Sequence, residues 1–266
     1  MNDDAQIYGY WTKGFRSGGY NLRSTVPASQ NPPGPFDPEE QNSFEVGAKA
    51  DWLGGRLRTN VALFHNTIDD LQREVNLPSG AGAGVVQLIR NTADATIQGA
   101  ELELEAVITS NFLVTAQLGY VDGEYDEVRY DISGDNVIND TDLALDIPRL
   151  APLTYGVGFT WEIPLGDFGT LTPRANFNHR DRSAYTDNNR GTLNTVDMLD
   201  ASVALSLLDD RLSIALFGRN LTDRVIEGND TQLPAAFQQL PVGTRNPTYS
   251  PLSKGRAVGV EVNYRM

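Results

Sequence analysis

One segment of the sequence has the residue types and spacing of a calcium-binding loop. Between positions 131 and 142, oxygen-bearing side chains stand at places 1, 3, 5, 9 and 12, and an apolar residue stands at place 8. Ca²⁺ needs six or more converging oxygens, and an EF-hand loop supplies them with this spacing, taking a backbone carbonyl from place 7. The segment therefore predicts a calcium site formed by Asp131, Ser133, Asp135, the Val137 carbonyl, Asn139 and Asp142.

Two places depart from the EF-hand pattern. Place 6 holds Asn136 instead of glycine, which is compatible because asparagine enters the left-handed region more readily than most residues. Place 12 holds Asp142, which is shorter than the usual bidentate glutamate. The alternative interpretation is an acidic outer loop rich in turn-forming residues, and the sequence leaves both open.

No arrangement of residues indicates catalysis. A nucleophile elbow, a zinc-protease histidine pair and a phosphate-binding loop are all absent from the sequence. Glu101 and Glu103 are interpreted as lumen or surface charges and not as a glycosidase pair, and the two histidines, His65 and His179, are far apart in sequence. We predict a protein that is not an enzyme and requires no cofactor, with Ca²⁺ as the one candidate ligand of this kind.

Composition excludes further classes. The net charge of −14 argues against nucleic acid as a partner, because binding phosphates requires clustered Lys and Arg. No stretch approaches the roughly 18 apolar residues of a transmembrane helix. The acidic start Met1 to Asp4 does not resemble a secretory signal, so an exported protein is expected only if this chain is a piece of a longer one.

The elements that must position these residues are strands. From Phe44 to Trp52, apolar or aromatic residues alternate with Glu, Gly, Lys and Asp, and on a bilayer-spanning strand the two aromatics would lie at the interfaces. The same alternation recurs often enough to predict about ten strands. The predicted strands lie around residues 7–11, 44–52, 57–63, 100–106, 112–120, 153–161, 172–184, 199–207, 212–216 and 258–266.

The connections alternate in length. Short turns are predicted at Gly54, Ser110, Gly166 and Asp209. Long polar loops are predicted over residues 17–41, 71–95, 126–149 and 223–250, with a shorter one near Asn188. Long loops at one end and short turns at the other are typical of an outer-membrane barrel, so we predict an all-β, antiparallel transmembrane β-barrel. A soluble sandwich, such as a carbohydrate-binding β domain, also alternates and remains an alternative.

Several motifs resemble those of a known family. They are the strand Tyr8 to Asn21 that leads into an outer loop, the Phe36-Asp37-Pro38-Glu39 stretch with Ser43 to Lys49, the strand Gly99 to Glu103, and Gly218-Arg219-Asn220-Leu221-Thr222-Asp223. In order and spacing they cover nearly the whole chain. The sequence resembles the C-terminal barrel of TonB-dependent receptors, in particular the iron-complex or siderophore branch.

The resemblance implies a barrel of about 22 strands with a plugged lumen. Residues 1–266 would be the C-terminal part of that barrel, about ten strands, without the plug domain, the TonB box or the first barrel strands. It implies an outer-membrane receptor and transporter, in contact with outer-membrane lipid, that takes up a ferric siderophore or similar scarce nutrient and couples to the TonB complex through the plug. Ligand contacts would come from the outer loops, where aromatic and Arg side chains suit anionic chelates; the candidates are Tyr20, Arg23, Phe36, Arg190, Arg245 and Tyr249.

One alternative of a different class stays open beside this one. A self-contained barrel of about ten strands would act as a passive pore, an adhesin or an outer-membrane protease. The residues themselves do not decide between a receptor and such a barrel.

Overall fold

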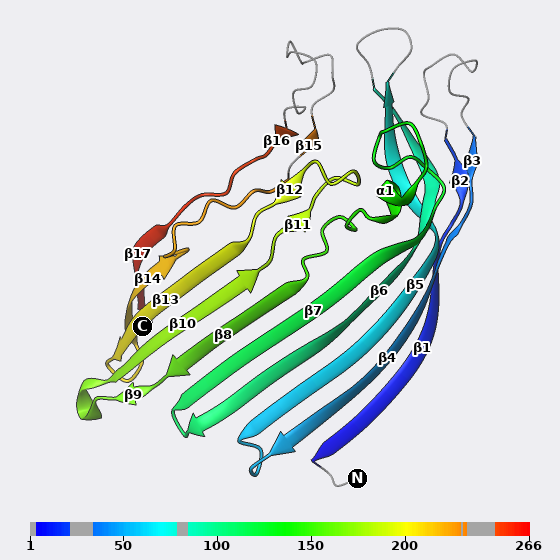
Figure 1. Ribbon diagram of the computed structural model, residues 1–266. Helices are drawn as coiled ribbons and strands as arrows, with labels where there is room; N and C mark the ends of the chain where they lie inside the picture. Colours follow the sequence, from blue (N-terminus) through cyan, green and yellow to red (C-terminus); the bar gives the residue numbers. More distant parts are fainter. Residues whose placement is uncertain (1–3, 22–33, 79–84, 230, 233–247) are drawn as a thin grey trace.

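The computed structural model describes residues 4–21, 34–78, 85–229, 231–232 and 248–266. One antiparallel sheet dominates it, and its long strands neighbour one another in chain order (Figure 1). These strands are β1 (Ala5–Arg16), β4 (Glu39–Trp52), β5 (Leu57–Pro78), β6 (Val85–Thr109), β7 (Phe112–Val128), β8 (Leu153–Trp161), β10 (Thr170–Arg180), β13 (Val196–Leu207), β14 (Leu212–Arg219) and β17 (Ala257–Tyr264). The predicted all-β, antiparallel fold is confirmed.

Small elements fill the connections. The two-residue strand β9 (Ile163–Pro164) pairs with β10, and the 3₁₀ turn η1 (Gly166–Phe168) follows it. At the other end of the sheet lie three short ladders and one helical turn, α1 (Asp140–Leu143). The ladders are β2 (Gly19–Tyr20) with β3 (Pro35–Phe36), β11 (Ser183–Ala184) with β12 (Thr192–Leu193), and β15 (Thr231–Gln232) with β16 (Thr248–Tyr249).

The short turns lie where the sequence predicts them. Gly54 and Gly55 adopt φ of 67° and 82°, and Asp209 adopts φ of 53°. Positive φ is open to glycine and tolerated by Asp, so these residues let β4 return into β5 and β13 into β14 within a few residues. The described parts of the long connections lie at the opposite end of the sheet (Figure 1).

One predicted loop is wrong. We expected residues 71–95 to be a polar loop, but β5 runs for 22 residues to Pro78 and β6 begins at Val85, so the two strands extend as a paired hairpin beyond their neighbours (Figure 1). The hairpin carries polar residues as well as apolar ones such as Val75 and Leu88, and register shifts between Ile68 and Gln72 interrupt its alternation. Its backbone is nevertheless paired across the ladder, which depends on the main chain and not on side-chain polarity.

The register gives the sheet two different faces. Residues directly opposite each other in an antiparallel pair point to the same face. One such row crosses nine strands and is apolar throughout: Trp52, Leu57, Ala106, Val114, Phe159, Ala175, Ala201, Gly218 and Val258. The adjacent row points the other way and is mostly polar: Asp51, Arg58, Glu105, Thr115, Gly158, Asn176 and Asp200. We call the second face the polar wall.

Aromatic side chains border the apolar face. Trp52 lies at the turn end of β4, and Phe112 packs against Trp161 at the same end of β7 and β8, with ring centroids 5.7 Å apart. Towards the loop end, Trp11 packs against Phe44. Phe44 and Trp52 are about 27 Å apart along the strand at ~3.4 Å per residue. A tilt of ~45° makes this about 19 Å of height, which approaches the apolar band of a membrane barrel.

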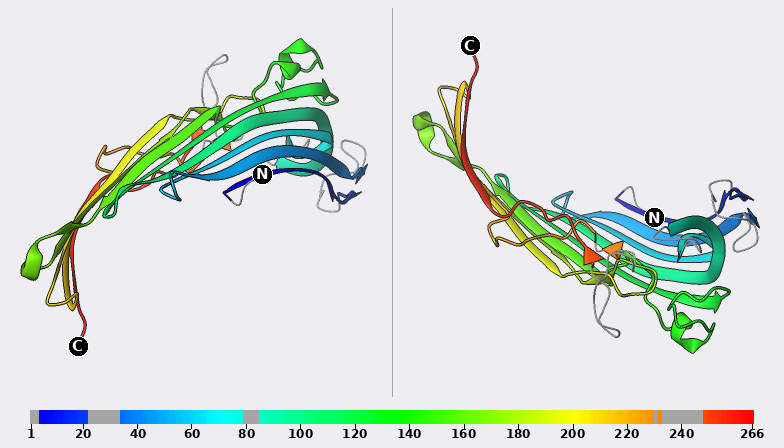
Figure 2. Two further views of the ribbon diagram at one scale, coloured as in Figure 1. Left: turned by 90° about the horizontal axis from the view of Figure 1, so that it is seen from below. Right: turned by 90° about the horizontal axis from the view of Figure 1, so that it is seen from above.

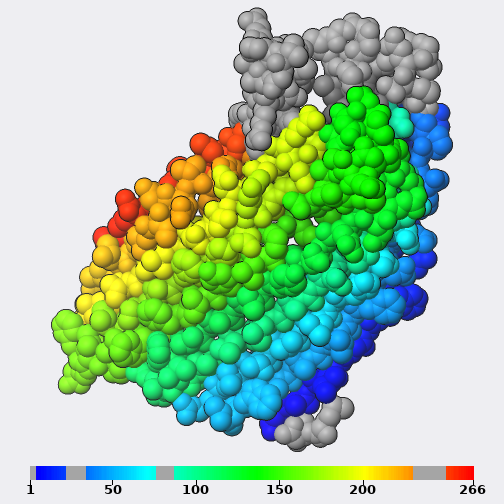
Figure 3. Space-filling view, in the orientation of Figure 1, coloured from blue at the N-terminus to red at the C-terminus, as the bar shows by residue number. Residues whose placement is uncertain are grey.

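The sheet forms a curved, open arc. Figure 2 shows the curvature from both ends, and Figure 3 shows the strands following one another obliquely in chain order. β1 and β17 are the two edges, and within the described residues they are not paired with each other. No helix among the described residues is long and apolar enough to cross a membrane.

The two faces lead to a first prediction. Val61 points to the apolar face between Ala48 and Leu102, whereas Asn60 points to the polar wall between Lys49 and Glu103. In lipid vesicles, Val61→Arg should lower the free energy of unfolding by about 2–4 kcal/mol, because it places a charge in hydrocarbon. The matched change Asn60→Arg should cost less than about 1 kcal/mol, and equal losses in a urea titration would contradict the face assignment.

Candidate functional site

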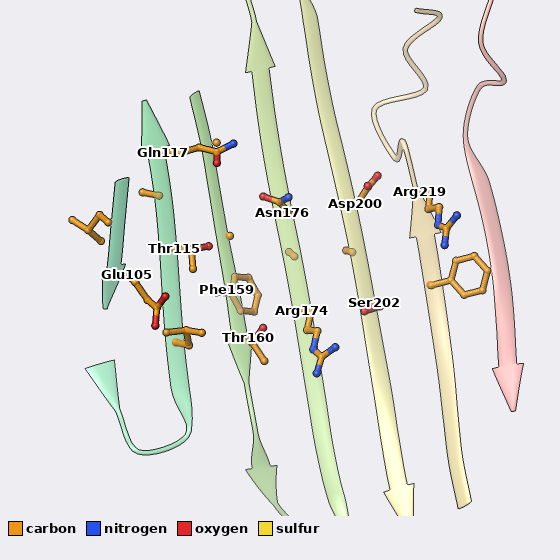
Figure 4. Close-up of a pocket in the computed structure, with 18 of the residues that line it drawn as sticks. Glu105, Thr115, Gln117, Phe159, Thr160, Arg174, Asn176, Asp200, Ser202 and Arg219 are labelled. Carbon is orange, nitrogen blue, oxygen red and sulfur yellow. The ribbon is translucent and has the colours of Figure 1, made fainter. Parts of the chain in front are cut away.

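A hollow of about 720 Å³ lies on the polar wall, between β5 and β17. Figure 4 shows the polar side chains that enter it from successive strands, among them Glu105, Gln117, Asn176 and Asp200. The two arginines Arg174 and Arg219 also line it, on β10 and β14. The hollow is therefore lined by charges of both signs and by amides, which suits a hydrated interior or a polar protein surface rather than an apolar ligand.

The acidic row on β6 belongs to this wall. Glu101, Glu103 and Glu105 lie opposite Ala62, Asn60 and Arg58 of β5. The Asn60 amide donates to Glu103 over 3.0 Å, while Arg58 pairs instead with Asp51. The sequence allowed a lumen or a solvent face for these glutamates, and the register places them on the same face as the hollow.

Two tyrosines hold a further carboxylate on the wall. The hydroxyls of Tyr8 and Tyr10 donate to the two carboxylate oxygens of Glu45 over 2.8 and 2.7 Å. The tyrosine rings stack on one another, with centroids 6.5 Å apart. This contact fixes the side chains of the edge strand β1 against β4.

At the loop end, a small apolar cluster covers the polar wall. Its buried members are Leu71, Ala93, Ala95, Tyr125 and Ile147. Residues 145–150 of the long connection after β7 pack onto β6 and β7 here, so that a Cβ added at Gly123 would lie 2.5 Å from Leu150 Cδ2. The connection between β7 and β8 thus folds over the wall instead of standing away from it.

The candidate calcium residues do lie together in this connection. The Asp131 carboxylate accepts the backbone N–H groups of Gly134 and Asn136 over 2.7 and 2.8 Å. The fully buried Asp142 carboxylate accepts the N–H groups of Ser133 and Asn139 over 2.7 and 3.0 Å.

The other members of the set serve the same short segment. Asn139 is the N-cap of α1, and its side-chain oxygen accepts the Thr141 N–H over 2.6 Å. Its amide donates to Asp135 over 3.0 Å and to the Val137 carbonyl over 3.4 Å. Asn136 adopts φ of 73°, the left-handed conformation expected at place 6.

These bonds occupy carboxylate oxygens that a cation would need. Asp131 and Asp142 use them as acceptors for backbone donors, which is the geometry of turns and helix caps. Within the described residues, no three His, Cys, Asp or Glu side chains are grouped as metal ligands. Calcium binding at Asp131 to Asp142 stays a prediction.

The predicted ligand contacts are only partly placed. Arg23 and Arg245 lie outside the described residues, and for Tyr249 only the backbone is described, in β16. Tyr20 is half exposed in β2, opposite Pro35 of β3. In the same ladder the Phe36 ring lies against Gly19, where an added Cβ would come within 2.6 Å of the ring.

Arg190 lies elsewhere, in the loop between β10 and β13, and its guanidinium donates to the Ser133 carbonyl over 3.1 Å. The structure thus brings Arg190 to the candidate calcium loop, and Tyr20 into one ladder with Phe36. The role of these residues in ligand binding stays a prediction.

The outer loops are joined to one another. Asn189 and Asp146 exchange two hydrogen bonds, of 2.6 and 2.8 Å, and the Arg149 N–H donates to Ala184 O over 2.7 Å. Gln72 on the β5–β6 hairpin donates to the carbonyls of Ser17 and Asp37 over 3.2 and 2.9 Å. Sequence reasoning missed these links, because side chain to backbone bonds between distant loops leave no periodic signal.

Sequence reasoning also missed part of the lining of the hollow. The alternation on β6 indicates the acidic side of the wall, but Arg174, Arg219 and Asp200 were not among the predicted site residues. Their signal was available, because each lies at a polar place one residue from an apolar-face residue of its strand. The order of neighbouring strands, which brings them to one hollow, is visible only in the fold.

A sheet with one apolar face and one charged wall, and with the described parts of its long loops at one end, has the pattern of a transmembrane β-barrel wall. The family described as TonB dependent receptor-like, beta-barrel, matches this chain over residues 1–265. The chain belongs to that family of TonB-dependent receptor barrels.

Individual relatives agree with this assignment. The probable TonB-dependent siderophore receptor PiuA of Acinetobacter baumannii is 28% identical over 89 residues, 34% of this chain and 11% of that protein. The ferric yersiniabactin uptake receptor FyuA of Yersinia pestis has a similar structure, with a TM-score of 0.74 at 19% identity, over 99% of this chain and 35% of that chain. The copper transporter OprC matches with a TM-score of 0.66 at 16% identity, over 99% and 38%. This chain spans about a third of those structures.

Chelation tests the calcium prediction. If calcium holds residues 131–142, EDTA should increase protease cleavage near Asn139, and added Ca²⁺ should restore protection. If the hydrogen bonds alone hold the loop, cleavage will be the same with and without EDTA. Asp142→Asn should increase cleavage in either case, because the amide side chain accepts fewer of the Ser133 and Asn139 N–H groups.

The same loop should respond to acid. Burial raises the pKa of Asp131, but the hydrogen bonds from the Asn136 and Gly134 N–H groups lower it more, so the folded pKa lies below the ordinary value. Such a group stabilises the loop above the unfolded pKa of about 3.9, and this is lost as the pH falls through the folded value. The protection factors for amide exchange at Gly134 and Asn136, which compare the observed rate with that of an unfolded chain at the same pH, should therefore be high at neutral pH and fall in acid. In Asp131→Asn the acid response should disappear; an unchanged response would refute this cause.

Proposed function

We propose that the protein is a bacterial outer-membrane receptor that imports a scarce nutrient, a ferric siderophore or a similar metal chelate, with energy from the TonB complex. Residues 1–266 would form part of the barrel wall. The observation that carries the proposal is the match to the receptor barrel family along the whole chain, on a sheet whose two faces differ in polarity.

The two faces support the membrane location. In hydrocarbon every backbone polar group must be paired, and side chains facing lipid must be apolar. The main sheet meets both conditions along the row from Trp52 to Gly218, whereas Val258 lies on the edge strand β17 and is apolar but paired on one side only. On this proposal the apolar face contacts outer-membrane lipid and the polar wall faces the lumen.

The polar wall supports a filled lumen. Arg174 and Glu105 line the hollow as charged side chains, and charges in an enclosed space are expected to be hydrated or paired. A plug domain from another part of a longer protein, in contact with the TonB complex, would supply polar partners for this wall. The loop end, with Tyr20, Phe36 and Arg190, would meet the ligand first.

The nature of the chelate stays open between metals. Of the proteins with similar structures, FyuA is a ferric yersiniabactin uptake receptor, whereas OprC is a copper transporter. Ferric siderophores are favoured here because PiuA, which is similar in sequence, is a probable TonB-dependent siderophore receptor.

Uptake in iron-starved cells tests the proposal. Deletion of the gene should abolish uptake of radioactive iron from at least one ferric siderophore in a panel, and the wild-type gene should restore it. Removal of the energy-coupling protein should have the same effect as the deletion. A copper complex belongs in the panel as the matched control for the metal.

Two outcomes would count against it. Unchanged uptake of every ferric chelate in the deletion strain would remove the iron assignment. Uptake that persists without the energy-coupling protein would instead support a passive pore.

A further inference from the structure

Three polar residues from distant parts of the chain meet at the loop end of the polar wall. Arg73 lies on β5, Tyr125 on β7, and Asp187 in the loop between β10 and β13. The charged groups that act on the Tyr125 hydroxyl are Arg73 and Asp187. No residue of this group belongs to the candidate contacts already described.

Two of these groups are buried without a hydrogen-bond partner. The Tyr125 side chain is only 5% exposed, and neither its hydroxyl nor the Arg73 Nε has an acceptor or donor within hydrogen-bond geometry among the described residues. Buried polar atoms are nearly always hydrogen-bonded, so an exception calls for a missing partner. The Tyr125 ring is fixed in the apolar cluster with Leu71 and Ile147, so its hydroxyl has little freedom to turn elsewhere.

Asp187 is the charged partner of Arg73, but the contact between them is weak. Its Oδ1 lies 3.5 Å from Arg73 Nε, beyond the roughly 2.7–2.9 Å of a charge-assisted hydrogen bond. The Asp187 and Arg73 side chains are 40% and 29% exposed, so this ion pair can be reached and displaced from solvent. The loop is held independently by Asn189 and Asp146, so Asp187 can turn away without the loop leaving.

The chemistry selects the ligand group. A guanidinium has only donors, and a tyrosine hydroxyl can donate, so together they match an anionic oxygen pair. Asp187 already presents a carboxylate at this place. A carboxylate on a ligand would take the same position with better geometry.

We propose that Arg73 and Tyr125 form a binding point for a carboxylate of an incoming chelate, and that Asp187 occupies it as an internal competitor until the ligand arrives. The proposal rests on the proposed function, because it concerns the loop end where a ligand would enter. It narrows the ligand to chelates that carry a free or metal-bound carboxylate. Arg73 binds its charge and Tyr125 fixes its orientation.

Binding measurements on outer-membrane vesicles bearing the protein test this, with ferric citrate as the carboxylate probe and a neutral ferric trihydroxamate as the control. Asp187→Asn should tighten ferric citrate binding by up to about fivefold, as expected when an exposed ion pair no longer competes. Tyr125→Phe should weaken it by about two- to tenfold, through loss of one hydrogen bond. Binding of the neutral probe should not change in either variant.

Asp140→Asn is the matched control for charge, because it removes one carboxylate from a different outer connection, in the helical turn α1. If Asp187→Asn tightens binding no more than Asp140→Asn does, the competitor role is wrong. If Tyr125→Phe binds ferric citrate like wild type, the unpartnered hydroxyl serves a water only and the binding point is overturned. Folding of each variant is checked by its resistance to unfolding in detergent.

The outcome separates this proposal from the receptor function. If the variants change ferric citrate binding as expected but deletion of the gene leaves cellular iron uptake unchanged, the proposed function is wrong and the carboxylate-binding point stands. If the wild-type protein imports the siderophore but neither Asp187→Asn nor Tyr125→Phe changes ferric citrate binding, only the carboxylate-binding point is wrong.

Discussion

The register of the antiparallel ladder is the constraint on which the rest of this structure depends. Because side chains alternate from face to face, a slip of one residue in any strand would send its apolar set to the polar wall. The row from Trp52 to Val258 and the row from Asp51 to Asp200 are one residue apart, yet one is apolar and the other polar. Tight turns at Gly54 and Asp209 help to fix that register, since they leave no slack between neighbouring strands.

A different kind of interaction organises the loop end. There the alternation is lost, and order comes from side chains that bond distant backbone: Gln72 to Ser17 and Asp37, Asn189 to Asp146, and Arg190 to Ser133. The small apolar cluster around Tyr125 anchors this network to β6 and β7. The protein therefore joins a wall held by backbone pairing to outer loops held mainly by Asn, Gln and Arg side chains, and these loops are where ligand recognition is proposed.

The sequence predicted the first kind of order well and the second poorly. Alternation from Phe44 to Trp52 and its repeats predicted the strands, the turns and the two faces. The reason is that the environment on each side of a sheet selects the residue type at every second position. Residues 71–95 were predicted wrongly, because register shifts between Ile68 and Gln72 interrupt the alternation while the main-chain pairing of the hairpin continues. Arg73, Tyr125 and Asp187 could not have been grouped from sequence, since two strands and one loop had to be placed before they met.

The loop from Asp131 to Asp142 shows why a motif alone does not decide chemistry. A carboxylate is an acceptor both for a cation and for backbone N–H groups, so turn and cap positions favour the same Asp and Asn residues that calcium favours. In this chain the bonds to Gly134, Asn136, Ser133 and Asn139 account for the spacing of Asp131 and Asp142 without a cation. The opposite holds for Arg73 and Tyr125. There the donors, Arg73 Nε and the Tyr125 hydroxyl, are buried, and the nearby acceptor Asp187 lies too far from Arg73 for a good hydrogen bond. Unpartnered donors are the stronger indication of a ligand, because a buried donor without an acceptor costs free energy that a bound acceptor would restore.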